Sequence, residues 1–158
     1  MSADRSETGA RQATEGFVTV LTAGQLFGLK LERVRDVFVP RGLSRVPLAP
    51  PEVAGLLNLR GRIVTAIDLR RRLGLPPRSD GAASVAVGFE ERGELYGLIV
   101  DKVSDALWLS PATHDVNPVN LDPRWARVCA GVHRLDHGLM VVLDVDKVLD
   151  LTRFGAAA

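Results

Sequence analysis

The chain has 158 residues, a formal net charge of +1 at neutral pH and a hydrophobic content of 46%. This length and composition allow one domain or two small subdomains, and so small a charge argues against a general polyanion binder. The single cysteine, Cys129, excludes an internal disulfide and indicates a reducing compartment. The first fifteen residues lack the apolar core of a signal peptide and no later run could cross a bilayer, so we expect a cytoplasmic protein.

The charge is distributed unevenly along the chain. Residues 30–78 carry eleven Lys and Arg against four Asp and Glu, a net of +7, whereas residues 79–158 carry seven against twelve, a net of −5. Opposite charges on two parts of one protein suit docking to differently charged partners, or head-to-tail contact between copies. The alternative is that solvated faces differ by chance.

The sequence contains two pairs of matching segments. LFGLKLERVRDVFV (residues 26–39) matches LYGLIVDKVSDALW (95–108) at a constant offset of 69, and each follows a glycine turn and an alternating apolar run. Alternation between glycine turns predicts strands and hairpins. AGLLNLRGRIVTAIDLRRRL (54–73) matches AGVHRLDHGLMVVLDVDKVL (130–149) at an offset of 76. Two matched pairs in the same order indicate an internal duplication.

Each half consists of several short predicted strands separated by turns. This pattern is typical of small β-barrels, in which closure removes exposed sheet edges. We therefore predict a mainly β fold with one domain over residues 16–151, divided into barrel subdomains at 16–79 and 80–151. The segments 1–15 and 152–158 are expected to be disordered tails.

Loops and short helices complete the predicted fold. PPRSDGAAS, residues 76–84, is the predicted linker between the halves, and the proline-rich LSRVPLAPPEVAG, residues 43–55, should be an ordered, extended loop. Helix formers follow Asp68 and Asp144 at the ends of apolar strands, which predicts one or two helical turns after each. The two aspartates could suggest a catalytic carboxylate pair, but capping of these helical turns explains both.

The two copies differ most at one hairpin. Arg60 and Arg62 of the first copy match Asp136 and Gly138 of the second. A guanidinium suits carboxylate partners, so Arg60 is a candidate for a specific ion pair, either within the chain to Asp36 or across an interface. An ordinary solvated turn residue is the alternative. The first copy also has three consecutive arginines that the second lacks: Arg70, Arg71 and Arg72.

Candidates for catalysis are weak. Cys129, His133 and His137 are spaced four apart, which would suit a metal site on a helix, but the repeat places them in a strand–turn–strand where this spacing does not converge. Cys129 has no visible partner that would activate it as a nucleophile. We therefore expect no metal, no cofactor and no catalytic residue, and hence a protein that is not an enzyme.

The apolar residues favour a binding module. Two small barrels in tandem leave a groove between them, which suits a partner helix. We expect Trp108 and Trp125 to be buried, with an interface anchor as the alternative. The residues predicted to line the groove are Val34, Val37, Val103 and Leu107.

The matched segments, in order over residues 17–151, resemble the CheW family of bacterial chemotaxis coupling proteins. VAGLLNLRG followed by IDLR carries the resemblance most specifically, together with FGLKLERVRDV and LYGLIVDKVSDAL. The resemblance implies two SH3-like five-stranded barrels sharing a hydrophobic core. Many members have a proline where this chain has Thr65, so we expect a more regular strand there.

The resemblance also implies a function and a set of contact residues. It implies an adaptor, associated with membrane-anchored receptor arrays, that joins the cytoplasmic tip of a methyl-accepting chemoreceptor to the regulatory domain of the histidine kinase CheA. Self-association in such arrays and membrane contact only through receptors are expected, and nucleic acid is not an expected partner. The groove would receive the receptor helix, and the interface residues that follow from the resemblance are Asp36, Gly55, Asn58, Leu59, Arg60, Gly61 and Arg62.

Two other functions stay open at this point. A basic small-barrel protein could bind RNA through Arg60, Arg62 and the arginines at 70–72, although no stacking aromatics lie nearby and the other half is acidic. A metal-dependent enzyme around Cys129 and His133 would require a bound metal.

Overall fold

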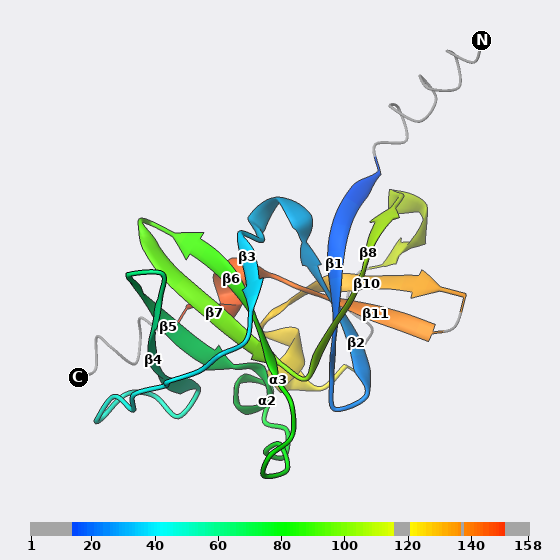
Figure 1. The fold of residues 1–158 in the computed structure, drawn as a ribbon. Helices are drawn as coiled ribbons and strands as arrows, with labels where there is room; N and C mark the ends of the chain where they lie inside the picture. Colours follow the sequence, from blue (N-terminus) through cyan, green and yellow to red (C-terminus); the bar gives the residue numbers. More distant parts are fainter. Residues whose placement is uncertain (1–13, 116–120, 137, 151–158) are drawn as a thin grey trace.

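The computed structural model describes residues 14–115, 121–136 and 138–150, which form two β-sheets with short helices between them (Figure 1). The six-stranded sheet has the order β8-β1-β2-β11-β10-β9, and the five-stranded sheet has the order β3-β6-β7-β5-β4. The predicted mainly β fold is confirmed.

The six-stranded sheet takes its strands from both ends of the described chain. Its members are β1 (Glu15–Thr22), β2 (Gln25–Lys30), β8 (Lys102–Leu109), β9 (His114–Asp115), β10 (Cys129–Leu135) and β11 (Gly138–Leu143). The five-stranded sheet consists of β3 (Asp36–Phe38), β4 (Val53–Leu59), β5 (Arg62–Asp68), β6 (Val85–Glu91) and β7 (Glu94–Val100). The helical elements are η1 (Leu31–Arg33), α2 (Leu69–Arg72), η2 (Pro111–Thr113), α3 (Pro123–Ala126) and α4 (Val145–Val148).

The sheets do not follow the predicted division at residues 79 and 80. After β2 the chain leaves the six-stranded sheet, and β3 pairs with β6; after β7 it returns, and β8 pairs with β1. Each half thus places two strands, β1 and β2 or β6 and β7, in the sheet built mainly from the other half, and the predicted subdomains 16–79 and 80–151 are not the two sheets. The predicted linker at 76–84 connects α2, which follows β5, to β6. It does not separate the two sheets, since β5 and β6 both belong to the five-stranded sheet, where β5 pairs in parallel with β7.

The pairing registers confirm the internal duplication. Thr65 and Ala66 of β5 lie opposite Tyr96 and Gly97 of β7. In the six-stranded sheet, Val141 and Val142 of β11 lie opposite Phe27 and Gly28 of β2. In the repeat, Thr65 matches Val141 at the offset of 76, and Phe27 matches Tyr96 at the offset of 69. The two parallel pairs are therefore equivalent, and both copies have the same register.

Three apolar clusters show how the barrels share a core. Leu57, Val64 and Ile99 belong to a cluster made by the five-stranded sheet. Phe17 and Met140 belong to a second cluster, made by the six-stranded sheet. The largest cluster joins both sheets and the helices α2 and α4, and includes Phe27, Leu29, Ile67, Leu98, Val128 and Leu143. Two barrel-like bodies therefore share the largest of these hydrophobic clusters, as predicted.

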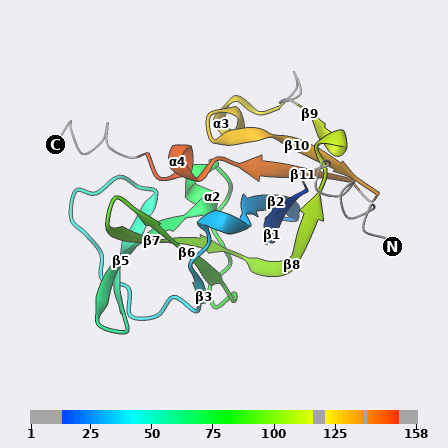
Figure 2. The ribbon, with the colours of Figure 1, turned by 90° about the horizontal axis from the view of Figure 1, so that it is seen from above.

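The predicted helical turns are present and capped as expected. The side chain of Asp68 accepts a hydrogen bond from the backbone N–H of Arg70, and that of Asp144 accepts one from Lys147. An N-cap side chain satisfies one of the free N–H groups of the first turn. The helices α2 and α4, which follow these caps, lie side by side between the sheets (Figure 2).

Two other predictions have different outcomes. Thr65 is paired on both sides, to Leu56 and to Tyr96, which confirms the regular strand expected there. The predicted burial of both tryptophans is wrong for Trp108, which is 64% exposed on the edge strand β8. Trp125 is partly buried and packs against Phe27.

In the described ranges, no helix is long and apolar enough to cross a membrane.

Candidate protein-docking site

The β4–β5 hairpin ends in the two-residue turn Arg60-Gly61. Both residues have positive φ, 51° at Arg60 and 86° at Gly61, as in the type I′ turn that matches the twist of two paired strands. The Oδ1 atom of Asn58 accepts a hydrogen bond from the backbone N–H of Gly61 at 2.9 Å. The turn therefore holds the Arg60 side chain at the tip of the hairpin, where the side chain is 72% exposed.

Arg60 forms an ion pair with Asp36. Asp36 begins β3, at one edge of the five-stranded sheet, whereas the β4–β5 hairpin forms the other edge. The pair therefore bridges the two edges and shows that the sheet curls into a barrel. This confirms the intrachain pairing that the sequence left open for Arg60.

A hollow of about 360 Å³ lies beside this pair. Phe38, Leu59 and Tyr96 are among its apolar lining residues, and they come from β3, β4 and β7 respectively. Its charged lining residues are Arg35, Asp36, Arg60, Arg62 and Glu90. An apolar hollow with charged residues around it can receive an apolar side chain of a partner while fixing its orientation by ion pairs.

Two of the cations around the hollow have no ion-pair partner among the described residues. Arg35 and Arg62 are both exposed, and neither forms a salt bridge within residues 14–115, 121–136 and 138–150. The neighbouring Arg60 already pairs with Asp36. The hollow thus offers two guanidinium groups to carboxylates of a partner.

Gly55, one of the predicted interface residues, is buried within the hairpin. Its φ is 152°, and a Cβ atom there would lie 2.6 Å from the carbonyl oxygen of Ser44. Ser44 and Leu56 form an isolated bridge that ties the proline-rich loop to β4. The structure therefore gives Gly55 a role in packing the loop beneath the hairpin.

We expect Gly55→Ala to lower the free energy of unfolding by about 1–3 kcal/mol, because the methyl group meets backbone atoms that cannot move aside cheaply. Urea denaturation measures this. Gly61→Ala is the control: Gly61 also has positive φ, but no atom lies within 4 Å of its Cβ position, so only the backbone strain of about 1 kcal/mol remains. Equal losses for the two variants would contradict the role of the Ser44 contact.

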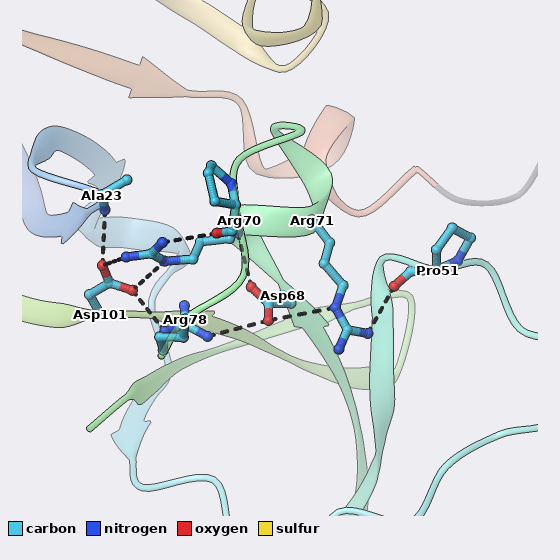
Figure 3. Close-up of polar contacts among 8 residues, drawn as sticks. Ala23, Pro51, Asp68, Arg70, Arg71, Arg78 and Asp101 are labelled. Carbon is cyan, nitrogen blue, oxygen red and sulfur yellow. Dashed lines mark hydrogen bonds and ion pairs between the residues drawn. The ribbon is translucent and has the colours of Figure 1, made fainter. Parts of the chain in front are cut away.

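The three consecutive arginines make contacts within the fold. Arg70 donates to Asp101 and to the carbonyl oxygen of Pro76, and Arg71 donates to the carbonyl oxygen of Pro51 (Figure 3). Arg72 donates to the carbonyl oxygens of residues 147 and 148, at the end of α4. These guanidinium groups are used within the fold, which disfavours the RNA-binding alternative.

The residues predicted to line a groove have mixed positions. Val34 and Val103 pack against the shared core and are partly buried. Val37 on β3 is 44% exposed, and Leu107 on β8 is half-buried. The groove for a receptor helix therefore stays a prediction, and of its four predicted lining residues Val37 alone is exposed.

The cysteine and histidine candidates lie in a strand, as the repeat indicated. Cys129 begins β10 and His133 lies four residues along the same strand, whereas His137 is outside the described residues. Burial raises the pKa of the Cys129 thiol to about 11, which disfavours the reactive thiolate. In the portion of the chain that the structure describes, no three His, Cys, Asp or Glu side chains are grouped to hold a metal.

Comparison with known proteins identifies the family. A family model described as a CheW-like domain matches residues 16–153, nearly the whole chain. The chain belongs to the CheW family. The probable chemotaxis protein CheW of Rhizobium etli is 28% identical to it over 136 residues, which is 84% of this chain and 86% of that protein. The chemotaxis protein CheW of Bacillus subtilis is 24% identical over 136 residues, 86% of this chain and 87% of that protein.

The fold of a solved CheW structure agrees with the one described above. The scaffolding protein TtCheW from Thermoanaerobacter tengcongensis superposes with a TM-score of 0.77 at 24% identity, covering 87% of this chain and 94% of that one. Family membership thus groups the chain with proteins named as chemotaxis proteins. The resemblance noted in the sequence is thereby confirmed.

The hollow includes lining residues that sequence reasoning missed. Leu59, Arg60 and Arg62 belong to both the predicted interface and the hollow, whereas Phe38 and Tyr96 were not predicted. The repeat matches Tyr96 to Phe27, but only the structure shows that Phe27 is buried whereas Tyr96 is partly buried beside the hollow. No local signal brings Phe38 to the tip of the β4–β5 hairpin, because Leu59 lies 21 positions after it in the chain.

Proposed function

We propose that this CheW-family protein couples the cytoplasmic tip of methyl-accepting chemoreceptors to the histidine kinase CheA, by protein–protein binding without catalysis. It would act in the cytoplasm, in arrays held at the membrane by the receptors. Within that function, the β4–β5 hairpin and the hollow beside it would contact the regulatory domain of CheA, and the receptor helix would lie near Val37 and Leu107.

The observation that supports this assignment most is the Arg60–Asp36 pair at the rim of the hollow. The pair holds Arg60 in one orientation while leaving most of its surface free. Exposed ion pairs stabilise a fold by only about 0–1 kcal/mol, so stability by itself does not explain the arrangement. A preorganised guanidinium next to an apolar hollow is well suited to an interface.

The partner surface would have a complementary chemistry. The apolar lining formed by Phe38, Leu59 and Tyr96 favours an apolar side chain. Arg35 and Arg62, which have no salt bridge within the described residues, favour carboxylates beside it. Charges at the rim mainly raise the association rate and select the partner. The proposed kinase contact is therefore an apolar anchor flanked by acidic residues.

The mechanism would be positional. The adaptor would hold receptor and kinase in a fixed relative geometry, so that a small displacement of the receptor tip changes the populations of kinase states. Weak pairwise contacts suffice in an array, because each bound component raises the effective concentration of the next.

Calorimetric titration with the CheA regulatory domain from the same organism tests this function. We expect binding in the micromolar range, about −8 kcal/mol, and a weaker affinity at high salt because charges contribute. Absence of binding to every resident kinase of this type would leave the family assignment intact and remove the coupling function.

A further inference from the structure

The β3–β4 loop, residues 39–52, gathers apolar side chains on the surface of the protein. Of the eight exposed large apolar side chains in the described ranges, four belong to this loop, and Leu48 is 99% exposed. Single apolar residues are normal on a surface, whereas several in one place indicate contact with another molecule. The four residues of the loop are Val39, Leu43, Val46 and Leu48.

Leu48 also has an unfavourable backbone conformation, with φ of 65°. Pro47 precedes it, and the N–H of Ala49 donates to the carbonyl oxygen of Val46 at 3.3 Å, as in a type II turn. This turn position favours glycine or asparagine, and a bulky side chain there strains the backbone. The other non-glycine residues of the described chain with positive φ each begin a two-residue hairpin turn that ends in glycine: Ala23, Arg60 and Arg92.

The loop is held in place on both sides of this turn. Ser44 and Leu56 exchange two backbone hydrogen bonds of 2.8 Å. The carbonyl oxygen of Glu52 accepts from the N–H of Asp68 at 2.9 Å. A loop that is fixed before it docks loses less conformational entropy on binding. Leu48 is thus presented in one position to the surroundings of the protein.

The loop is also cationic. It carries Arg41 and Arg45, both exposed, and has no acidic residue before Glu52. Neither arginine forms a salt bridge within residues 14–115, 121–136 and 138–150. An exposed leucine flanked by two guanidiniums suits a partner surface that is both apolar and acidic.

A hollow of about 630 Å³ on the same protein has this complementary chemistry. It lies between the β6–β7 turn and α4, where Tyr96 and Leu149 supply apolar surface. Four carboxylates and two cations line it, so negative charge is in excess. Arg33 pairs with two of the four, whereas Glu94 is exposed and forms no salt bridge among the described residues. We call this the acidic hollow, and its carboxylates are those of Glu91, Glu94, Asp146 and Asp150.

The loop and the acidic hollow lie at opposite ends of the five-stranded sheet. The loop ends beside Asp68, the last residue of β5, whereas the β6–β7 turn lies beside the start of β5, since Leu95 is opposite Val64. Figure 1 shows the loop at the lower left and the β6–β7 turn at the upper left. The seven residues of β5 span about 20 Å. Leu48 therefore does not reach the acidic hollow of its own chain.

We propose that copies of this protein associate head to tail, with Leu48 of one copy seated in the acidic hollow of the next and with Arg41 and Arg45 facing its carboxylates. Two different surfaces meet in this contact, so it builds rings or rows of copies and not a closed twofold dimer. The opposite net charges of residues 30–78 and 79–158 agree with it. The strained leucine then has a function as the anchor of the contact. The contact needs this chain alone and does not depend on the proposed function.

Sedimentation velocity over a concentration series tests the association. We expect the mean mass of the parent protein to rise with concentration beyond that of a dimer. Leu48→Asn should raise the dissociation constant at least about tenfold, because the apolar anchor is lost. Its urea unfolding midpoint should equal or exceed that of the parent, since asparagine tolerates positive φ at this turn position.

A mixture of two variants tests the head-to-tail geometry. Glu94→Arg reverses a charge of the acidic hollow and should weaken association by a similar factor. Glu32→Arg is the control, at an exposed acid outside the acidic hollow that matches Asp101 in the repeat, and should associate like the parent. Leu48→Asn keeps an intact acidic hollow and Glu94→Arg an intact loop, so their equimolar mixture should form a dimer and nothing larger.

Three results would overturn the proposal: a parent that is monomeric at every concentration, association of Leu48→Asn or Glu94→Arg as strong as that of the parent, or a mixture that stays monomeric. If the parent is monomeric and Leu48→Asn instead weakens binding to the CheA regulatory domain, the loop contacts the kinase and not a second copy.

Discussion

Asp101→Asn is expected to lower the free energy of unfolding by about 2–4 kcal/mol at neutral pH. The substitution keeps the shape of the side chain but leaves Arg70 and Arg78 with one carboxylate instead of two. A shielded charge without its partner destabilises a fold more than the pair had stabilised it. Urea denaturation of the two proteins measures the difference, and Glu32→Gln should change stability by less than about 0.5 kcal/mol.

The loss in Asp101→Asn should depend on pH. The hydrogen bond from Arg70 is the largest cause that holds the pKa of the Asp101 carboxyl well below its usual range, and the bonds from Ala23 and Arg78 add to it. Because the folded pKa is the lower one, the unfolded chain binds the proton first as pH falls, and stability from this group is then lost. The difference between the two proteins should be full at neutral pH and shrink below about pH 4. A difference that is constant down to pH 2 would contradict the assignment.

Arg60→Glu is expected to weaken binding to the CheA regulatory domain by more than about tenfold while the protein stays folded. The new carboxylate would face Asp36 and reverse the charge presented at the hollow. Since the Arg60–Asp36 pair is mostly exposed, we expect the free energy of unfolding to fall by no more than about 1 kcal/mol. Calorimetry measures the affinity and urea denaturation the stability.

Arg92→Glu is the matched control for Arg60→Glu. Arg92 lies in the corresponding position of the β6–β7 turn, with φ of 53° followed by Gly93 at 82°, and its side chain is 88% exposed. It does not line the hollow. We expect unchanged kinase affinity. Equal losses in both variants would indicate a general charge effect, and unchanged affinity in Arg60→Glu would remove the hairpin from the interface.

These two experiments separate two uses of arginine in one short segment. Arg60 and Arg62 lie at the tip of the hairpin and are exposed, so they are available to a partner. Arg70 lies eight residues after Arg62, but it is enclosed by Asp101 and the loop after α2. Substitution of the first group should therefore change binding, and substitution of the second should change stability.

Much of the fold follows from local sequence signals. Alternating apolar residues between glycine turns predict the hairpins, and aspartates at the ends of apolar strands predict the two capped helical turns. The duplication predicts that the halves share one architecture. The contrast between Arg60 and its counterpart Asp136 also points to the hairpin that borders the hollow. These features depend on residues close together in the chain, or on direct comparison of two segments.

Only the tertiary structure decided how the halves combine. The exchange of the β1–β2 and β6–β7 hairpins between the halves depends on which strands of the other half they pair with, and residues in a single hairpin carry no record of that choice. The same holds for the parallel pairs of β2 with β11 and β5 with β7, which lie far apart in sequence. The sequence by itself determined the family, the strands and the exposed arginine turn. The folded chain determined which arginines stay exposed, because the carboxylate that engages Arg70 lies 31 residues away, at the crossing between the sheets.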